Sequence, residues 1–398
     1  MSIQKSHTYN VRIKKNKKLG CISLILVAII VYFFDYGCSG YNQKIPKQIL
    51  STYEDVPPIE EKSHTTINLF YGTNRKYNLK DGIVTYGNTK ALEELKRDTV
   101  YYGICSVSIP RSHKMGKIES KNKWKLQFRN NPNKYVEILS NEILDRDSFF
   151  YYTKEVVSNH TDKSALLFVH GYNNSFDAAA KRTAQLTYDL AFEGASYFFS
   201  WPSSAGFLNY TQDETSIKKS KPVIKEFIIN LINNAEIDKL YIIAHSMGTR
   251  GVTEALGEIF EENPSLTSKI DETILAAPDI DAQIFKDQIA NKILNKGVRF
   301  TVYASNDDKA LKGSKKIHKF PRLGDSGGGL VILEGLQTID ATGKDAGFAD
   351  HAYFAENNSV LSDIWYLINN DLSAEERFGL RQVKKGSNKY YKFREYCD

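Results

Sequence analysis

The segment Ala-His-Ser-Met-Gly at residues 244–248 has the form of a nucleophile elbow, the sharp turn that presents a reactive serine. The apolar run at 240–244 predicts a buried strand before this turn, and the residues from 247 onward predict a helix after it. Positions two before and two after the serine crowd each other in such a turn, so small residues are needed there, and Ala244 and Gly248 meet that need. Ser246 is therefore the predicted nucleophile of a hydrolase that forms a covalent intermediate.

Such a site also needs two backbone N–H groups that point at the negative charge developing on the substrate's carbonyl oxygen. The residue after the nucleophile, Met247, normally supplies one of them. The other comes from the loop after an earlier strand, and the predicted strand at 165–169 ends in His170-Gly171-Tyr172. Because Gly171 allows close approach of the backbone, the N–H of Tyr172 is the predicted second donor.

The general base is chosen by chain order, because an elbow of this kind is followed along the chain by the acid and then by the histidine. Of the eight histidines only His318 and His351 follow Ser246. His351 comes after the last predicted strand, whereas His318 lies in a lysine-rich stretch that is typical of solvated surface. We therefore expect His351 to be the base. His170 precedes the serine and is not expected to fill that role.

The acid that orients the base should follow the carboxyl end of a strand. Asp307 and Asp308 follow the predicted strand at 299–304, and Asp279 follows the predicted strand at 273–277. The later strand end is the more common source of the acid, so Asp308 is favoured, with Asp307 next and then Asp279. Up to this point the residues leave these three alternatives open.

The chain from residue 65 to residue 372 alternates short β-rich runs with longer amphipathic stretches, which predicts an α/β domain. Its central sheet should be mostly parallel, with helices on both faces. The first strand candidates lie too close together for crossover helices, so the front edge should be antiparallel. The strand candidates are residues 66–71, 103–109, 124–128, 165–169, 196–200, 240–244, 273–277, 299–304 and 337–339, and the helix candidates are residues 175–192, 213–233, 247–260 and 356–368.

Composition and charge exclude several classes of protein. With 41% hydrophobic and 25% charged residues, the composition is that of a globular protein. The net charge of +6 equals the six lysines and arginines that precede residue 20, and residues 373–398 are predicted to form a second basic, solvated tail. The body is slightly acidic, so no nucleic-acid partner is expected. No metal site or disulfide framework is expected from the spacing of the four cysteines, Cys21, Cys38, Cys105 and Cys397.

The N-terminal residues 1–38 are predicted to tether the protein to a membrane. The apolar stretch at 20–34 follows a basic cluster and ends at Asp35, which is the order of a secretory signal or a signal anchor. The stretch is shorter than the ~20 residues that span a bilayer, although its flanks extend it. An uncleaved anchor is favoured over a lipidated Cys38 and over a cleaved signal. Residues 39–64 should then be a linker, with the body outside the cytoplasm.

These motifs resemble those of a bacterial α/β-hydrolase family that is recognised by sequence and whose substrates are uncharacterised. The resemblance covers roughly residues 66–370. It implies the α/β-hydrolase fold, and the match of Asp308 to the family's Asp-x-Ala-Leu pattern implies that Asp308 is the acid. Many members carry a signal or lipoprotein segment. The matching segments are residues 70–75, 102–103, 107–110, 170–173, 199–203, 244–248, 276–279 and 308–311.

The family is similar in outline to lipases and esterases, which implies acyl transfer to water from a small acyl-ester or lipid-like substrate, a reaction that needs no cofactor. Two alternatives share the fold. One is a thioesterase or peptidase that uses the same three residues, and the other is a binding protein without catalysis. Arg75 and residues 201–203 follow strand candidates, where they either line a substrate pocket or serve in packing.

Overall fold

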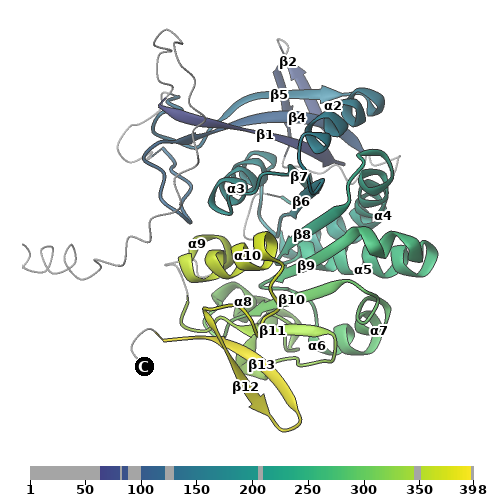
Figure 1. The fold of residues 1–398 in the computed structure, drawn as a ribbon, viewed down its shortest axis with the longest axis vertical. Coiled ribbons are helices and arrows are strands. Elements are labelled where there is room, and N and C mark those ends of the chain that lie inside the picture. Colours follow the sequence, from purple (N-terminus) through teal and green to yellow (C-terminus); the bar gives the residue numbers. More distant parts are fainter. Residues whose placement is uncertain are drawn as a thin grey trace, which may run out of the picture. The chain divides into compact units, whose positions relative to one another are not determined.

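The computed structural model describes residues 63–80, 83–87, 100–121, 130–204, 209–344 and 351–395 (Figure 1). The chain divides into two units, Met1–Glu60 and Glu61–Asp398, and the described residues all belong to the second. The predicted anchor, most of the predicted linker and the strand candidate at 124–128 therefore lie outside the described residues. None of the helices in the described ranges is long and apolar enough to cross a membrane.

A sheet of eleven strands runs through the described part of the second unit. In the order of the sheet, the strands are β12 (Leu380–Lys385), β13 (Asn388–Phe393), β11 (Leu336–Asp340), β10 (Arg299–Ala304), β9 (Ile270–Ala276), β8 (Lys239–His245), β6 (Ser164–Val169), β7 (Ala195–Ser200), β1 (His64–Thr73), β4 (Tyr101–Pro110) and β5 (Ile138–Leu144). Neighbouring strands are parallel from β13 to β1. β4 and β5 add an antiparallel front edge, and β12 adds an antiparallel strand at the opposite edge.

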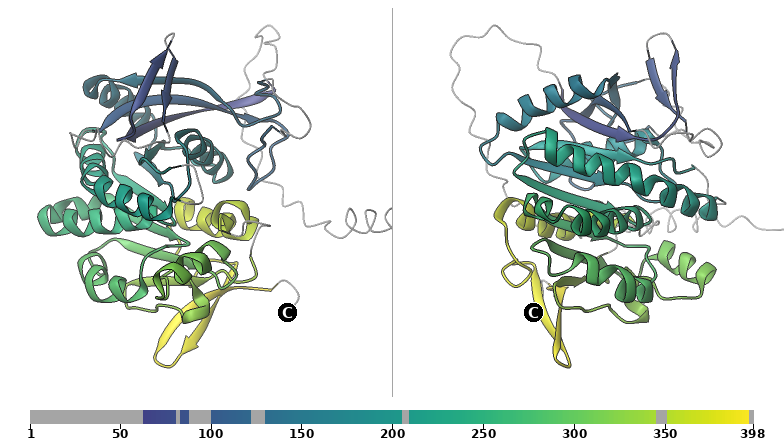
Figure 2. Two further views of the ribbon diagram at one scale, coloured as in Figure 1. Left: turned by 180° about the vertical axis from the view of Figure 1, so that it is seen from behind. Right: turned by 90° about the vertical axis from the view of Figure 1, so that its right-hand side faces the viewer.

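Helices cover both faces of this sheet (Figure 2). The helical elements are α2 (Arg146–Ser158), α3 (Phe176–Asp189), α4 (Tyr210–Asn234), α5 (Gly248–Glu262), η2 (Pro264–Lys269), α6 (Ala282–Ile284), η3 (Phe285–Ile289), α7 (Ala290–Ile293), α8 (Lys309–His318), η4 (Ser326–Gly328), α9 (Tyr353–Glu356) and α10 (Asn358–Asn370). One buried cluster joins the sheet to α2, α4, α5 and α7, and a second joins it to α3, α9 and α10. Alternate side chains of β8 enter the two clusters, Ile242 the first and Ile243 the second.

The predicted fold class is confirmed: a mostly parallel sheet with helices on both faces and an antiparallel front edge. Each strand candidate within the described residues overlaps an observed strand, and each helix candidate overlaps an observed helix. Strand β5 and helix α2 were not among the candidates. A small hairpin of β2 (Tyr77–Lys80) and β3 (Ile83–Tyr86) lies outside the main sheet.

The prediction that residues 373–398 form a solvated tail is wrong. β12 and β13 form a hairpin there, and β13 pairs in parallel with β11, so the domain continues at least to Phe393. Leu380, Tyr391 and Phe393 are buried. The hairpin buries only one of its faces, and its other face carries lysines and arginines. The segment is therefore basic in composition, although apolar residues alternate along its strands.

Arg377 lies just before this hairpin and is fully buried. Its Nη1 donates to Asp363 Oδ2 at 3.1 Å and to the Tyr303 hydroxyl at 3.3 Å, and its Nη2 donates to Gln337 Oε1 at 3.0 Å. The ion pair with Asp363 is inaccessible to solvent, with side-chain exposures of 0% and 1%. Removing the cation would leave the carboxylate buried and uncompensated.

We therefore expect Arg377→Met to lower the free energy of unfolding by about 3–5 kcal/mol. Urea denaturation would measure this loss. Arg381→Met is the matched control, since Arg381 is exposed on the same hairpin and its loss should cost less than about 0.5 kcal/mol. A cost below about 1 kcal/mol at Arg377 would mean that the pair does not hold the hairpin.

Candidate active site

Ser246 occupies the turn between β8 and α5, as the sequence predicts. Its φ of +52° lies in the left-handed region, which costs energy for a residue with a side chain and is kept only where the surroundings enforce it. Its backbone N–H donates to the carbonyl of Ala276 at 3.0 Å, which ties the turn to β9. A Cβ added to Gly248 would lie 2.3 Å from the carbonyl oxygen of His170, so only glycine fits there.

A continuous chain of hydrogen bonds joins Ser246, His351 and Asp308. The distance from His351 Nε2 to Ser246 Oγ is 2.6 Å, and the distance from His351 Nδ1 to Asp308 Oδ2 is 2.7 Å. Asp308 is buried between β10 and α8, where its other oxygen accepts the N–H of Leu311 at 2.9 Å and so fixes the carboxylate. His351 lies just before α9, with 19% of its side chain exposed. The structure thus brings the three favoured candidates together.

The charge of Asp308 changes the affinity of His351 for protons. Burial by itself lowers the pKa of His351, but the charge and hydrogen bond of Asp308, helped by the charge of Asp279, outweigh burial. The net pKa of His351 is therefore raised above its ordinary value. A histidine in this setting readily accepts a proton from the serine hydroxyl.

The structure does not bring the alternative acids to His351. Asp307 Oδ2 accepts the backbone N–H of Gly343 at 2.9 Å. Asp279 is buried and occupied by other partners, since it accepts hydrogen bonds from Ser314 Oγ at 2.6 Å, from Arg250 Nη2 at 3.1 Å and from the Tyr210 hydroxyl. The other histidine that follows the serine, His318, is the last residue of α8, and its side chain lies outside the described part.

The loop after β6 lies against the elbow, where the sequence places the second N–H donor. A Cβ added to Gly171 would lie 2.7 Å from Ser246 Cβ, so the loop touches the serine through a glycine. Tyr172 follows directly, and Met247 is buried in the turn that begins α5. Of the two residues predicted to supply oxyanion donors, Met247 thus follows the serine directly, and Tyr172 follows the glycine that touches it.

His245 is a site residue that the sequence reasoning missed. Its Nε2 lies 3.0 Å from the backbone carbonyl of His351, and its ring packs against those of His351 and Phe354, with centroid distances of 4.7 Å and 4.6 Å. Burial holds the pKa of His245 well below its ordinary value, so the ring is neutral and its Nε2–H can donate to that carbonyl. The residue next to the serine thus holds the backbone of the predicted base, and its place in the motif is the only sequence signal for this role.

Arg75, Trp201 and Ser203 contact the loop at 170–174: Arg75 Nη2 donates to the carbonyl of Asn174 at 2.7 Å, and Ser203 Oγ accepts the N–H of Asn174 at 3.2 Å. Arg75, Trp201 and Ser203 are fully buried, and the Trp201 indole N–H donates to the carbonyl of His170 at 2.7 Å. These residues therefore pack against the loop at 170–174 and restrict its position.

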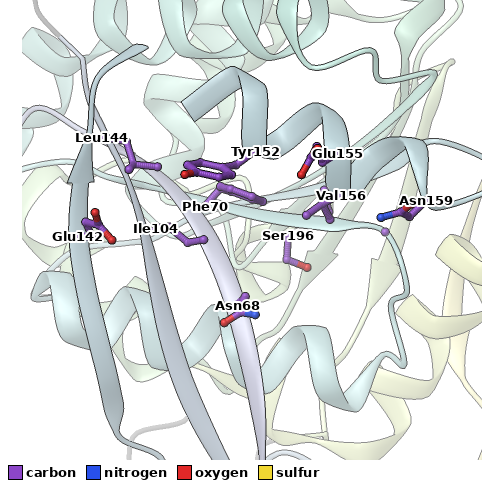
Figure 3. Close-up of a pocket in the computed structure, with 12 residues that line it drawn as sticks. Asn68, Phe70, Ile104, Glu142, Leu144, Tyr152, Glu155, Val156, Asn159 and Ser196 are labelled. Carbon is purple, nitrogen blue, oxygen red and sulfur yellow. The ribbon is translucent and has the colours of Figure 1, made fainter. Parts of the chain in front are cut away.

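A cavity of about 480 Å³ lies away from the site, between α2 and the front of the sheet (Figure 3). Phe70, Ile104 and Leu144 from the strands line it, together with Tyr152 from the helix. Its lining includes Gly194, which directly precedes β7, whereas Ser246 and Asp308 follow the carboxyl ends of their strands. The cavity is therefore no part of the site. The described residues also contain no cluster of three side chains suited to a metal ion.

Comparisons with known proteins agree with this architecture. The model of a family described as alpha/beta hydrolase of unknown function (DUF900) matches residues 146–370, which is more than half of the chain. An uncharacterized protein of Nostoc sp. is 34% identical over 73 residues, a match that spans 18% of this chain and 18% of that relative. The chain thus matches less than a fifth of the length of this curated relative.

Two solved structures are similar in fold alone. Est1E from Butyrivibrio proteoclasticus is 10% identical with a TM-score of 0.35, and the likeness covers 54% of this chain and 91% of that one. The carboxylesterase CesB from Bacillus subtilis is 7% identical with a TM-score of 0.32, and the likeness covers 58% of this chain and 100% of that one.

Proposed function

The chain belongs to the family of alpha/beta hydrolases of unknown function (DUF900), and on that premise we propose that it is a serine esterase acting through Ser246, His351 and Asp308. The observation that carries the proposal is the hydrogen-bonded chain from Ser246 Oγ through His351 to the buried carboxylate of Asp308. Its substrate would be a small acyl ester or a lipid-like ester. The chemistry needs no cofactor, because the protein supplies nucleophile, base and acid.

In the proposed reaction Ser246 Oγ attacks the carbonyl carbon while its proton passes to His351 Nε2. Asp308 stabilises the imidazolium that forms, and the backbone N–H groups of Met247 and Tyr172 stabilise the negative oxygen of the tetrahedral intermediate. The C–O bond to the alcohol then breaks, and the alcohol leaves with the proton from His351. Water, deprotonated by His351, attacks the acyl-enzyme and releases the carboxylic acid and the free serine.

A panel of substrates with one acyl group and three leaving groups tests the proposed specificity. We expect acyl esters to be hydrolysed with the highest kcat/KM. They should exceed the matched amide because an amine leaves only after full protonation, and they should exceed the matched thioester if the site is specific for the ester oxygen as proposed. A preference for the amide or the thioester would overturn the esterase assignment. A wild-type protein that hydrolyses none of them and takes no fluorophosphonate label would instead be a binding protein on this fold.

The pH dependence of the reaction follows from the raised pKa of His351. His351 must be neutral to act as a base, so kcat/KM should fall as the pH drops through this raised pKa, with a midpoint above that of an ordinary histidine. Rates measured from pH 5 to pH 9 on a neutral ester would locate the midpoint. A midpoint below the ordinary histidine value would show that Asp308 does not act on the base as proposed.

We further propose that residues 1–38 tether the protein to a membrane, with the body outside the cytoplasm. The support is the basic cluster followed by the apolar stretch at 20–34. Membrane fractionation of the full chain, compared with a chain that lacks residues 1–40, tests the tether. We expect the full chain in the membrane fraction, and a fully soluble full chain would refute the tether.

A further inference from the structure

The ring of His170 holds the peptide group that carries the predicted oxyanion donor. His170 is buried, and its Nδ1 lies 2.8 Å from the carbonyl oxygen of Gly171. A carbonyl oxygen can only accept, so Nδ1 carries the proton. That carbonyl belongs to the same planar peptide unit as the N–H of Tyr172, and in a trans peptide the two point in opposite directions. Fixing the carbonyl therefore fixes the direction of the N–H.

Two neighbours keep this proton on Nδ1. Arg75 Nη2 lies 3.3 Å from His170 Nε2, and the Ser200 hydroxyl lies 3.4 Å from it. A guanidinium only donates, so Nε2 must accept and cannot carry a proton of its own. Burial and the charge of Arg75 lower the pKa of His170 to about 3, which keeps the ring neutral at working pH. A single tautomer of His170 results.

Arg75 itself is held in one position by groups from several loops. It is fully buried, and it donates to Ser200 Oγ at 2.7 Å, to the Asn174 carbonyl at 2.7 Å and to the Ser203 carbonyl at 3.2 Å. Its hydrogen-bond acceptors among the described residues are neutral. Burial lowers its pKa to about 9, so the guanidinium still carries its charge at neutral pH. Burying a cation without a bonded carboxylate lowers the stability of the fold. Arg75 is therefore better explained by an effect on the site than by a contribution to stability.

The loop is also held on its other side. The Trp201 indole donates to the carbonyl of His170 at 2.7 Å, and the two rings stack with their centroids 5.0 Å apart. The Asn174 side chain donates to the carbonyl of Tyr172 at 2.9 Å. The loop from His170 to Asn174 thus has little freedom to rotate the peptide unit between Gly171 and Tyr172.

We propose that His170 and Arg75 are positioning residues for the oxyanion hole: His170 aims the Tyr172 N–H through the Gly171 carbonyl, and Arg75 fixes the tautomer that lets it do so. The inference rests on the proposed acyl-transfer function. Neither residue touches the reacting atoms. Their effect should therefore fall on the stabilisation of the transition state and leave substrate binding nearly unchanged.

Two substitutions of His170 distinguish its hydrogen bond to the Gly171 carbonyl from its contribution to packing. Asparagine places an amide N–H near the position of Nδ1, whereas glutamine places its amide near the position of Nε2. Removal of one oxyanion donor costs about 10²–10³ in kcat, so His170→Gln and Arg75→Met, which misaim the donor, should lower kcat by about 10–100-fold with KM within about threefold. His170→Asn should retain at least about tenfold more activity than His170→Gln. Arg377→Met, which removes another fully buried arginine, is the control for stability, and its kcat should not change.

All rates are taken per active site titrated with a fluorophosphonate, which removes the effect of partly unfolded protein. Equal kcat values for His170→Asn and His170→Gln, or an unchanged kcat in Arg75→Met, would overturn the inference.

The tautomer of His170 gives a readout that does not need activity, and its decisive spectrum is that of the wild-type protein. Nitrogen-15 spectra of the wild-type histidine side chains should show His170 as the Nδ1–H form from pH 5 to pH 9, and Arg75→Met should show a mixture of tautomers. An Nε2–H form in the wild type would overturn the inference. Absence of both turnover and labelling in the wild type would instead overturn the proposed function, while the spectra would still decide how the loop is held.

Discussion

Replacing Ser246 by alanine should lower kcat for an acyl ester by about 10⁴–10⁶-fold, because no other group in the proposed mechanism can form the acyl-enzyme. Residual hydrolysis should come from the oxyanion donors and from substrate binding, which remain in place. KM should change little, since the hydroxyl contributes little to ground-state binding. The alanine also relieves no strain, because the left-handed φ of +52° is imposed by the turn and not by the hydroxyl.

The measurement is the steady-state rate of Ser246→Ala, with labelling by a fluorophosphonate as a second readout. Ser268→Ala is the matched control, since Ser268 is an exposed serine outside the site and should leave both readouts unchanged. Activity above about 1% of the wild type in Ser246→Ala would place the nucleophile elsewhere.

The second large effect is expected at the acid. Asp308→Asn should lower kcat by about 10⁴-fold, because an amide that donates to Nδ1 would hold His351 in the tautomer that cannot accept the serine proton. Asp307→Asn should change kcat by less than about threefold, since Asp307 bonds the Gly343 backbone and not the base. These two substitutions differ by one position in the chain and make the same chemical change, so they form a matched pair.

Asp279→Asn should affect stability rather than catalysis. Asp279 pairs with Arg250 and lies 3.4 Å from Arg322, so its loss should reduce stability more than kcat. We expect kcat per titrated site to stay within about tenfold of the wild type. A larger loss of kcat at Asp279 than at Asp308 would overturn the assignment of the acid. Urea denaturation of the three variants separates the loss of stability from the loss of catalysis.

The elbow and the fold were predictable because local patterns encode them. A buried strand at 239–245, a small residue on each side of the serine and a helix after it all lie within one stretch of chain. The parallel sheet follows in the same way, since its central strands are continuous apolar runs. The choice between Asp307 and Asp308 rested on a family pattern. Its structural basis is the turn that starts α8, where the backbone N–H of Leu311 turns the Asp308 carboxylate inward.

Features that depend on contacts distant in sequence were not predictable. Arg75 and His170 are 95 positions apart, and only the packing of β1 and β6 around β7 brings them together. The C-terminal hairpin was mistaken for a tail because it has one buried face and joins β11 across an intervening helix pair. Helix α2 was missed because its hydrophobic residues form a weak stripe, although Asp145 caps it by accepting the N–H groups of Asp147 and Ser148.

The most direct test of the account is the search for the acyl-enzyme. The wild-type protein is mixed with an ester of a slowly released acyl group, quenched in acid within the first turnover, digested and analysed by mass spectrometry. We expect the mass of one acyl group on the peptide that contains Ser246, formed in a burst with one equivalent of alcohol and absent from Ser246→Ala. Turnover of the ester without an adduct on Ser246, or with the adduct on another residue, would contradict the proposed mechanism.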